Sequence, residues 1–308
     1  MSLPAPNTFA GATLDRAGHL RTDPERLAAL RADPAARAVV VVREGALVEG
    51  EVGTFGADAW DRPTGSVRAV RVPLGADAQP DAPFLGLEPG GAPLFALDAL
   101  PGGAPPAGTE PLNLRAAAAI LPAEDAGLLG YASGLLHWHR ATRFCGKCGA
   151  ATAAGEGGHV RSCRNGHSHH PRTDPVVIML VTDGDRVLLG RQAVWPERRY
   201  SALAGFVEPG ESLEEAVARE VREETGVDVA GVRYVSSQPW PFPASLMLGF
   251  EARYAGGEPA TLDGELEDVA WFSRDEVAAA AGEGGAGRLL LPPRLAIARR
   301  LVDAWIGS

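Results

Sequence analysis

The order of the elements that the 308-residue sequence predicts in its C-terminal part favours a mixed fold, either α+β or an α/β sandwich, and three observations support this prediction. Two apolar runs, at 176–181 and 186–190, flank a turn at Asp183-Gly184-Asp185 and predict a buried strand with its hairpin partner. An amphipathic acidic helix is expected over about 212–225. The remaining elements are strands near 231–236, 245–254 and 269–272 and a terminal helix over about 292–305.

The N-terminal half predicts a mainly β domain over residues 1–140. Apolar segments at 38–42 and 67–72 are separated by turns rich in Gly, Pro and Asp. Residues 86–111 are rich in Pro, Gly and Ala, so we expect a surface loop or a connection between strands there. A helix is expected over about 114–140. A Cys/His/Gly-rich segment at 141–173 then separates this domain from a second one at 174–308.

Charge and cysteine content narrow the class of protein. The 29 Lys and Arg residues against 39 Asp and Glu residues give a net charge of −10, which disfavours a surface that coats nucleic acid generally but leaves a local basic site open. No run approaches the roughly 18 apolar residues of a membrane helix, so no membrane partner is expected. Three clustered cysteines make a poor disulfide framework and indicate metal ligands in a reducing, cytoplasmic compartment.

The acidic helix is the most informative segment. Ser212 and Glu215 have the spacing of a capping box, and Gly226 predicts the end of the helix. Glu220, Glu223 and Glu224 lie at i, i+3 and i+4, so their carboxylates share one side of the helix and repel each other. A divalent cation relieves that repulsion, and ligands that are all oxygen suit Mg²⁺ or Mn²⁺ and phosphate chemistry. The alternative is a solvated charged helix face.

The same segment matches the pattern Gly-x5-Glu-x7-Arg-Glu-U-x-Glu-Glu-x-Gly-U, where U is apolar, at every fixed position from Gly205 to Val227. It therefore resembles the Nudix box, and residues 174–308 resemble a Nudix hydrolase domain. The resemblance implies an α/β/α sandwich that hydrolyses a nucleoside diphosphate linked to another group, with several Mg²⁺ or Mn²⁺ ions. It implies that Glu220 and Glu224 are the principal metal ligands and that Glu223 is a ligand or helps to deprotonate water. Further implied roles are carboxylate orientation by Arg219 and metal contacts from the Ala204 carbonyl and Glu265.

A second motif narrows the substrate. In the segment Ser237-Gln-Pro-Trp-Pro-Phe-Pro-Ala-Ser245, prolines alternate with aromatic residues, which predicts a stiff loop with an indole able to stack on a flat ring. The alternative is a turn whose aromatic side chains only fill the core. The segment is similar to the Ser-Gln-Pro-Trp-Pro-Phe-Pro-x-Ser motif of the NADH pyrophosphatase family of Nudix hydrolases. The substrate-binding residues implied by this resemblance are Phe206, Gln238, Pro239, Trp240, Pro241, Phe242, Pro243, Ala244, Ser245 and Ala298.

That resemblance implies hydrolysis of NADH or NAD⁺ to nicotinamide mononucleotide, reduced or oxidised, and AMP, and members of the family also remove NAD caps from RNA 5′ ends. The alternatives are a Nudix hydrolase of another nucleoside diphosphate derivative, such as ADP-ribose or a diadenosine polyphosphate, and a non-catalytic NAD(H) sensor. The N-terminal half is expected, by the same resemblance, to be a degenerate Nudix-like domain that helps to form a homodimer.

The cysteine segment resembles the zinc ribbon of that family. Cys145-Gly-Lys-Cys148 is followed by Cys163, but the family's fourth cysteine is replaced by Asn165 or Gly166, depending on which side the spacing is counted from. His167 is the nearest suitable ligand, with His169 behind it. A structural Cys3His zinc site and a degenerate, metal-free ribbon both remain open at this point.

Overall fold

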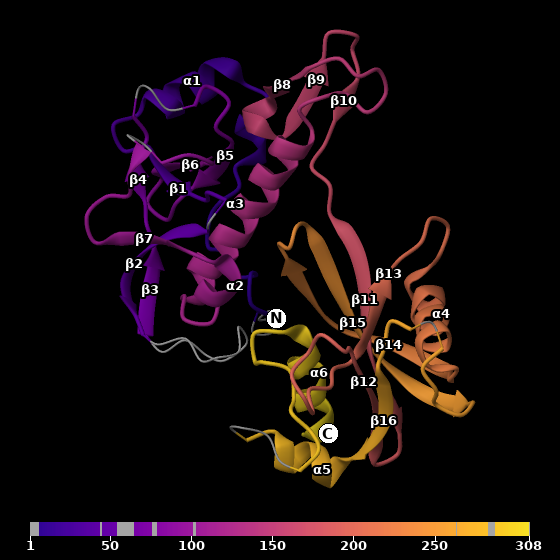
Figure 1. The fold of residues 1–308 in the computed structure, drawn as a ribbon. Helices are drawn as coiled ribbons and strands as arrows, with labels where there is room; N and C mark the ends of the chain where they lie inside the picture. The colour runs from indigo at the N-terminus through magenta and orange to yellow at the C-terminus, as the bar shows by residue number, and fades with distance from the viewer. Residues whose placement is uncertain are drawn as a thin grey trace. The chain divides into compact units, whose positions relative to one another are not determined.

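The computed structural model describes residues 6–43, 45–53, 65–75, 79–100, 103–262, 264–282 and 287–307. The chain divides into two compact units. The first unit consists of Met1–Thr173 and Trp240–Ala244, and the second of Asp174–Pro239 and Ser245–Ser308. In Figure 1 residues up to 173 run from indigo to dark pink, and residues 174–308 run on from dark pink to yellow.

Two small sheets form the β part of the first unit. The four-stranded sheet has the order β4-β1-β6-β5, in which β1 and β6 are parallel and the other pairs antiparallel. The second sheet, β3-β2-β7, is antiparallel. The bounds are β1 (Arg37–Val40), β2 (Ala46–Val52), β3 (Gly65–Ala69), β4 (Val72–Pro73), β5 (Phe84–Leu87), β6 (Pro93–Leu97) and β7 (Thr109–Leu112).

Strand β6 corrects the expectation for residues 86–111. All five of its residues are buried, and Phe95 packs against Phe84 with ring centroids 5.4 Å apart. The prolines and glycines on either side favour turns, so the local sequence does not predict a strand here. The strand forms because Leu94 and Phe95 are buried in the core.

Helices of the first unit pack against these sheets. Besides α1 (Pro24–Ala32), the unit has α2 (Leu114–Ala117) and α3 (Ala123–Ala141), so the single helix expected over 114–140 is interrupted. Pro122 precedes α3, and a proline disfavours helical geometry in the residue before it. Buried side chains of α3, among them Leu129, Leu136 and Trp138, pack with Val39, Leu85 and Leu94 of the sheets.

The Cys/His-rich segment forms a three-stranded antiparallel ribbon with the order β10-β9-β8. Its strands are β8 (Thr152–Gly155), β9 (Val160–Cys163) and β10 (Ser168–His169). Buried Arg161 fixes the ribbon to α3, because its guanidinium donates to Nδ1 of His139 (3.0 Å) and to the carbonyl of Thr152 (2.9 Å). His139 in turn hydrogen-bonds the carbonyl of Gly158 at 2.7 Å.

The second unit is built on a six-stranded mixed sheet. Strands follow the order β14-β15-β11-β12-β16, and β13 also pairs with β11. Strand β11 is parallel to β15 and antiparallel to β12 and β13. The bounds are β11 (Asp174–Asp183), β12 (Arg186–Arg191), β13 (Leu203–Phe206), β14 (Asp228–Trp240), β15 (Ser245–Gly256), β16 (Asp268–Ser273), α4 (Leu213–Thr225), α5 (Arg274–Ala280) and α6 (Ile297–Ile306).

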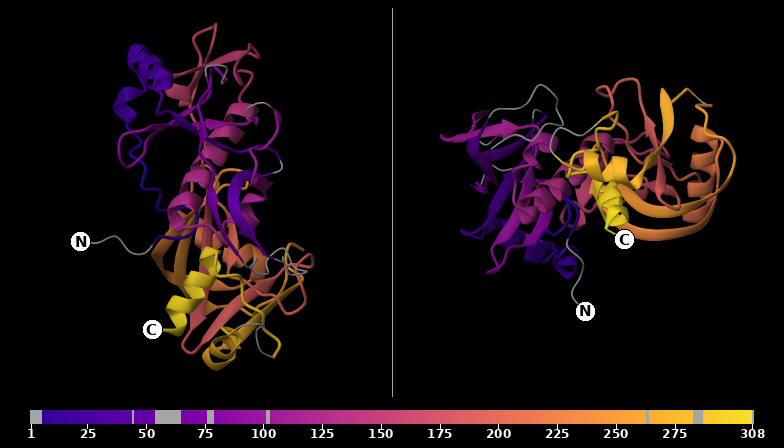
Figure 2. Two further views of the ribbon diagram at one scale, coloured as in Figure 1. Left: turned by 90° about the vertical axis from the view of Figure 1, so that its left-hand side faces the viewer. Right: turned by 90° about the horizontal axis from the view of Figure 1, so that it is seen from below.

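Helices cover both faces of this sheet, which confirms the predicted α/β/α sandwich. Alternate residues of β11 face opposite sides: Val177 and Met179 pack with the buried face of α4, while Ile178 and Leu180 pack with α5 and α6. The continuous apolar run arises because both sides of this strand are covered. Figures 1 and 2 show α4 and α6 on opposite faces of the sheet.

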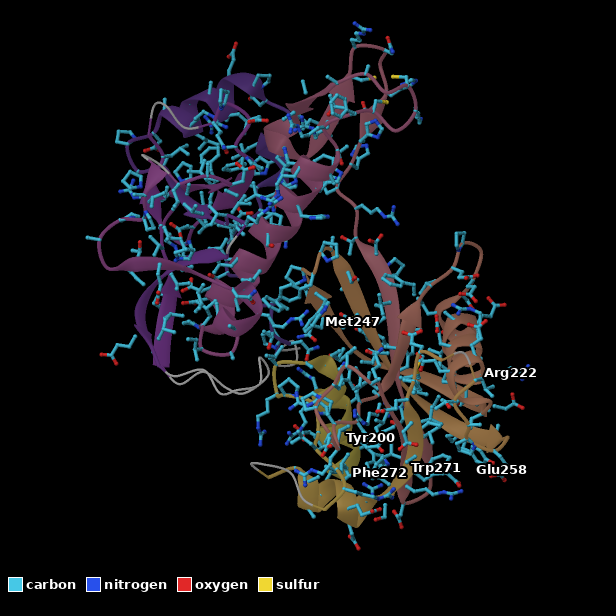
Figure 3. All side chains as sticks on the ribbon, viewed as in Figure 1. Tyr200, Arg222, Met247, Glu258, Trp271 and Phe272 are labelled. Carbon is cyan, nitrogen blue, oxygen red and sulfur yellow. The ribbon has the colours of Figure 1, made fainter. Side chains whose placement is uncertain are left out.

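On the α5 and α6 face, Tyr200 anchors the segment before β13. Its ring meets Phe272 edge to face with centroids 4.9 Å apart (Figure 3), and its hydroxyl donates to the carboxylate of Asp268. Burial and this hydrogen bond raise the pKa of Tyr200 to about 12, so the phenol stays protonated and keeps donating. None of the described helices is long and apolar enough to cross a membrane.

Candidate active site

Local contacts fix both ends and the apolar side of helix α4. The backbone N–H of Glu215 donates to Ser212 Oγ (3.2 Å), and the N–H of Ser212 donates to the Glu215 carboxylate (2.8 Å), completing the predicted capping box. Gly226 ends the helix at φ 72°, a left-handed conformation that favours glycine. Val217 and Val221 are fully buried against the sheet.

Arg219 organises the acidic residues. Its guanidinium donates to the carboxylates of Glu211 (2.5 and 2.9 Å), Glu220 (2.8 Å) and Glu223 (2.9 Å), and to the backbone carbonyl of Phe206 (2.9 Å). Its hydrogen bonds to Glu211 lower the pKa of that carboxyl to about 2 and raise the pKa of Arg219. One arginine therefore ties α4 both to the preceding loop and to the end of β13.

Gly205 lets the Glu220 carboxylate lie directly against β13. A Cβ placed on Gly205 would lie 1.9 Å from Cδ and 2.1 Å from Oε1 of Glu220, far inside van der Waals contact. Burial raises the pKa of Glu220, and the charges of Glu223 and Glu265 act in the same direction, although Arg219 opposes them. A positive ion beside Glu220 would offset this cost.

The three glutamates of α4 differ in exposure. Glu224 is 3% exposed, whereas the side chain of Glu223 is 54% exposed and that of Glu220 13% exposed. A buried carboxylate is costly unless it is paired or coordinates a cation, and an all-oxygen donor set is the one that Mg²⁺ and Mn²⁺ prefer. The residues present therefore fit a divalent-cation site.

The end of β13 places two more predicted residues beside this cluster. Ala204 pairs with Ile178 of β11 and directly precedes Gly205. Phe206 follows Gly205, and 61% of its surface is exposed while Arg219 binds its carbonyl. An exposed aromatic ring thus stands next to the carboxylate cluster.

Gln238 has a contact that sequence reasoning missed. It is 1% exposed, its side-chain amide donates to the carbonyl of Leu295 (2.7 Å), and its Oε1 accepts from the N–H of Ile297 (2.8 Å). These bonds hold the first turn of α6, where Ala298 is 3% exposed. Fifty-nine residues separate Gln238 from Ile297, so no local signal in the sequence reveals the contact.

Residues Trp240–Ala244 of the Pro-Trp-Pro-Phe-Pro loop belong to the first unit. Trp240 is half-buried, and its ring meets Phe9 (6.2 Å) and Phe242 (5.2 Å) edge to face. The Arg115 guanidinium carbon lies 5.3 Å from the centre of the Trp240 ring and 4.6 Å from that of Phe242. The neighbouring Pro239, Ala244 and Ser245 are half-buried, Pro241 is buried and Pro243 is exposed.

The ribbon brings four potential metal ligands together. The sulfur atoms of Cys145, Cys148 and Cys163 and Nδ1 of His167 all lie within 4.8 Å of one another. Cys148 and Cys163 have an Sγ–Sγ distance of 3.8 Å, and His167 Nδ1 lies 3.5 and 3.7 Å from the sulfurs of Cys145 and Cys163. Tetrahedral zinc with Zn–S bonds of about 2.3 Å has edges of about 3.8 Å, and these three distances are close to that value.

The surroundings of Cys148 favour its thiolate, whereas burial raises the pKa of the Cys145 thiol. The backbone N–H of Ala150, the Asn165 amide and His167 lower the pKa of the Cys148 thiol to about 6. His169 lies outside this set of four, although its Nε2 is 3.2 Å from the Cys145 sulfur.

The glycine, glutamates and arginine that the Nudix pattern fixes are the groups in mutual contact around α4, so the second unit has the architecture of a Nudix hydrolase domain. Residues 172–291 match the NUDIX domain model. Residues 35–138 match the model of the NADH pyrophosphatase-like rudimentary NUDIX domain, which confirms the degenerate Nudix-like character expected of the N-terminal half.

The chain belongs to the NudC-like, NADH pyrophosphatase-type family of Nudix hydrolases. It is 42% identical over 308 residues to the NAD-capped RNA hydrolase NudC of Mycobacterium bovis, with 94% of this chain and 92% of that protein covered. It is 44% identical over 197 residues to the human NAD-capped RNA hydrolase NUDT12, covering 60% of this chain and 43% of that protein. A NUDIX hydrolase structure from Nitrosomonas europaea aligns with 44% of this chain and 80% of its own at 25% identity and a TM-score of 0.39.

Proposed function

We propose that this protein hydrolyses the pyrophosphate of NADH or NAD⁺ to nicotinamide mononucleotide and AMP at the polar side of α4. The observation that carries the proposal is the Arg219-centred carboxylate cluster, packed against Gly205, in a chain 42% identical over nearly its full length to an NAD-capped RNA hydrolase. The net charge of −10 does not prevent binding of a small dinucleotide that coordinates metal through its phosphates.

In this proposal Glu220, Glu223 and Glu224 hold Mg²⁺ or Mn²⁺, with the Ala204 carbonyl and Glu265 as further contacts. Cations bound there neutralise pyrophosphate charge and lower the pKa of an attacking water. Arg219 orients the carboxylates, as its bonds to Glu220 and Glu223 support. Gly205 leaves the space that the Glu220 carboxylate occupies.

Two aromatic residues are proposed to bind the flat rings of the substrate. Phe206 is supported by its exposure and by its place next to Gly205 on β13. Trp240 is proposed on the resemblance of its loop to the family motif. Because Trp240 meets Phe9 and Phe242 edge to face, its indole has support on one side that would hold it in a fixed orientation.

NAD-capped RNA is the second candidate substrate, favoured by the names of the relatives in Mycobacterium bovis and in humans. Competition between NADH and capped RNA at equal concentration tests it, and a much smaller kcat/KM for the RNA would argue against it. We further propose a homodimer formed with the rudimentary NUDIX domain, a structural zinc ion on Cys145, Cys148, Cys163 and His167, and a cytoplasmic location that keeps these thiols reduced.

Product analysis by mass spectrometry tests the proposal. The protein is incubated with Mn²⁺ or Mg²⁺ and, separately, NADH, NAD⁺, ADP-ribose and a diadenosine polyphosphate. We expect AMP and reduced nicotinamide mononucleotide from NADH in equal amounts. Preferential turnover of ADP-ribose or the diadenosine compound would identify the alternative hydrolase, and NADH binding without AMP formation would identify a sensor.

A further inference from the structure

The ribbon segment has a charge opposite to that of the whole chain. Residues 140–172 contain six Lys and Arg residues and one acidic residue, Glu156, in a protein of net charge −10. A Zn²⁺ ion on three thiolates and one imidazole would add a charge of about −1, which leaves the segment basic. A local excess of this kind creates a positive field close to the ribbon even though the whole molecule repels anions.

The metal cluster gathers part of this charge at one end of the ribbon. Lys147 directly precedes Cys148, and Arg164 directly follows Cys163, and the two sulfurs are 3.8 Å apart. Lys147, Arg164 and nearby Arg143 are all exposed. No acidic side chain among the described residues forms an ion pair with any of these three, although Arg161, which is buried, has one with Asp81. The three cations are therefore available to an external anion.

An exposed aromatic ring lies next to Arg143 in the chain. Phe144 follows Arg143 and is 64% exposed, whereas the next residue, Cys145, is 3% exposed. The backbone on both sides is fixed, since the N–H of Thr152 donates to the carbonyl of Arg143 (3.0 Å) and the N–H of Cys145 donates to that of Ala150 (2.8 Å). The difference in exposure shows that the Phe144 ring faces solvent, as the exposed Arg143 does, while the Cys145 side chain faces the inside of the ribbon.

We propose that this surface, the ribbon face formed by Arg143, Phe144, Lys147 and Arg164, binds the single-stranded RNA that follows an NAD cap. Cations that contact phosphates, beside an aromatic ring on which a base stacks, are the combination that binds single strands without sequence preference. An acidic protein segment would use the charges, but it has no flat base for Phe144. The inference rests on the proposed function, because it assigns to the ribbon the part of a capped RNA that free NADH lacks.

The test compares binding and turnover in the full-length protein. Fluorescence anisotropy measures binding of a short oligoadenylate without a cap, in several salt concentrations and without divalent cations. We expect Arg143→Glu, Lys147→Glu and Arg164→Glu each to weaken binding and to reduce the slope of log affinity against log salt by about one. Phe144→Leu is expected to weaken binding about fivefold or more, and Phe144→Trp to retain it.

The control is Arg26→Glu, which makes the same change of charge at an exposed position of α1 in the same unit. We expect this variant to bind RNA as the wild type does, and all variants to keep their zinc content. In turnover, the ribbon-face variants should raise KM for NAD-capped RNA several-fold and leave kcat/KM for NADH unchanged. Unchanged RNA affinity in the charge reversals, or an equal loss with Arg26→Glu, would overturn the proposal.

The oligoadenylate assay also separates this inference from the proposed function. If the wild type hydrolyses neither NADH nor capped RNA but the ribbon-face variants still lose RNA affinity, the proposed activity is wrong and the ribbon face stands. If NADH is hydrolysed and the ribbon-face variants bind and turn over RNA like the wild type, the inference fails and the activity stands.

Discussion

Gly205 and Glu220 lie so close that the glycine has no room for a side chain. A Cβ on Gly205 would come within 1.9 Å of the Glu220 carboxyl carbon, although the two residues belong to different elements, β13 and α4. This contact places a carboxylate against the edge of the strand that carries the Ala204 carbonyl. The position of the α4 cluster thus depends on the absence of one methyl group.

Gly205→Ala is expected to lower kcat/KM for NADH by about 100-fold, because Glu220 must move by an ångström or more to clear the new methyl group. The free energy of unfolding should fall by only about 1–3 kcal/mol, the usual cost of overpacking. Steady-state kinetics and urea denaturation measure the two effects. Gly134→Ala in α3 is the matched control, since a Cβ there meets nothing within 4 Å. Normal turnover in Gly205→Ala would show that Glu220 need not occupy its present position.

The Glu211–Arg219 pair predicts a pH dependence of stability. The folded-state pKa of Glu211 is about 2, below its ordinary value of about 4.5, so its stabilising contribution is fully present above about pH 4.5 and is lost as the pH falls toward 2. The difference in unfolding free energy between the wild type and Glu211→Gln should therefore be constant from pH 7 to 5 and shrink between pH 4.5 and 3. Chemical denaturation at each pH measures it. A difference that stays constant down to pH 3 would contradict the assigned pKa.

The ribbon cluster predicts which histidine holds zinc. His167 Nδ1 completes a set of four atoms with tetrahedral spacing, and His169 lies outside that set. Purified His167→Ala should lose most of a zinc content of about one ion per chain, whereas His169→Ala should keep it. Mass spectrometry of the metal content decides between them. Zinc loss in His169→Ala with retention in His167→Ala would reverse the assignment, and a wild type without zinc would support the metal-free ribbon.

Substitution of Trp240 distinguishes two roles of the proline-rich loop, binding of the substrate and filling of the core. If the indole stacks on the substrate, Trp240→Leu raises KM for NADH about 2- to 10-fold with little change in kcat. Trp138→Leu serves as the control, because Trp138 is 6% exposed in the core of the first unit and its loss should lower stability and leave KM unchanged. If Trp240→Leu behaves as this control does, the ring only fills the core.

Local chemistry explains which elements the sequence could predict. The capping box at Ser212 and the glycine at 226 set the ends of α4. Strand β11 is a continuous apolar run because both of its faces are buried. Both elements can therefore be predicted from residues that are neighbours in the sequence. Strand β6 was missed because prolines and glycines surround it, and its burial depends on distant residues such as Phe84.

In the candidate site, too, the local features could be predicted from the sequence and the contacts between elements could not. The carboxylates of α4 follow from spacing within one helix. The bonds of Arg219 reach Glu211 and the Phe206 carbonyl, 8 and 13 residues away and outside α4. Those of Gln238 reach the start of α6, 57 and 59 residues away. Such contacts depend on how the elements pack, so no local pattern in the sequence predicts them.

The most direct test of the account is AMP release from NADH by Glu224→Gln. Glu224 is 3% exposed in α4, so a glutamine of the same shape should preserve the fold while removing the charge that we propose binds a cation. We expect turnover in Mn²⁺ to fall by about 100-fold or more with a native circular dichroism spectrum. Glu214→Gln, at an exposed position in the first turn of the same helix, should keep full activity. Comparable AMP release from Glu224→Gln and the wild type would contradict the proposed metal site.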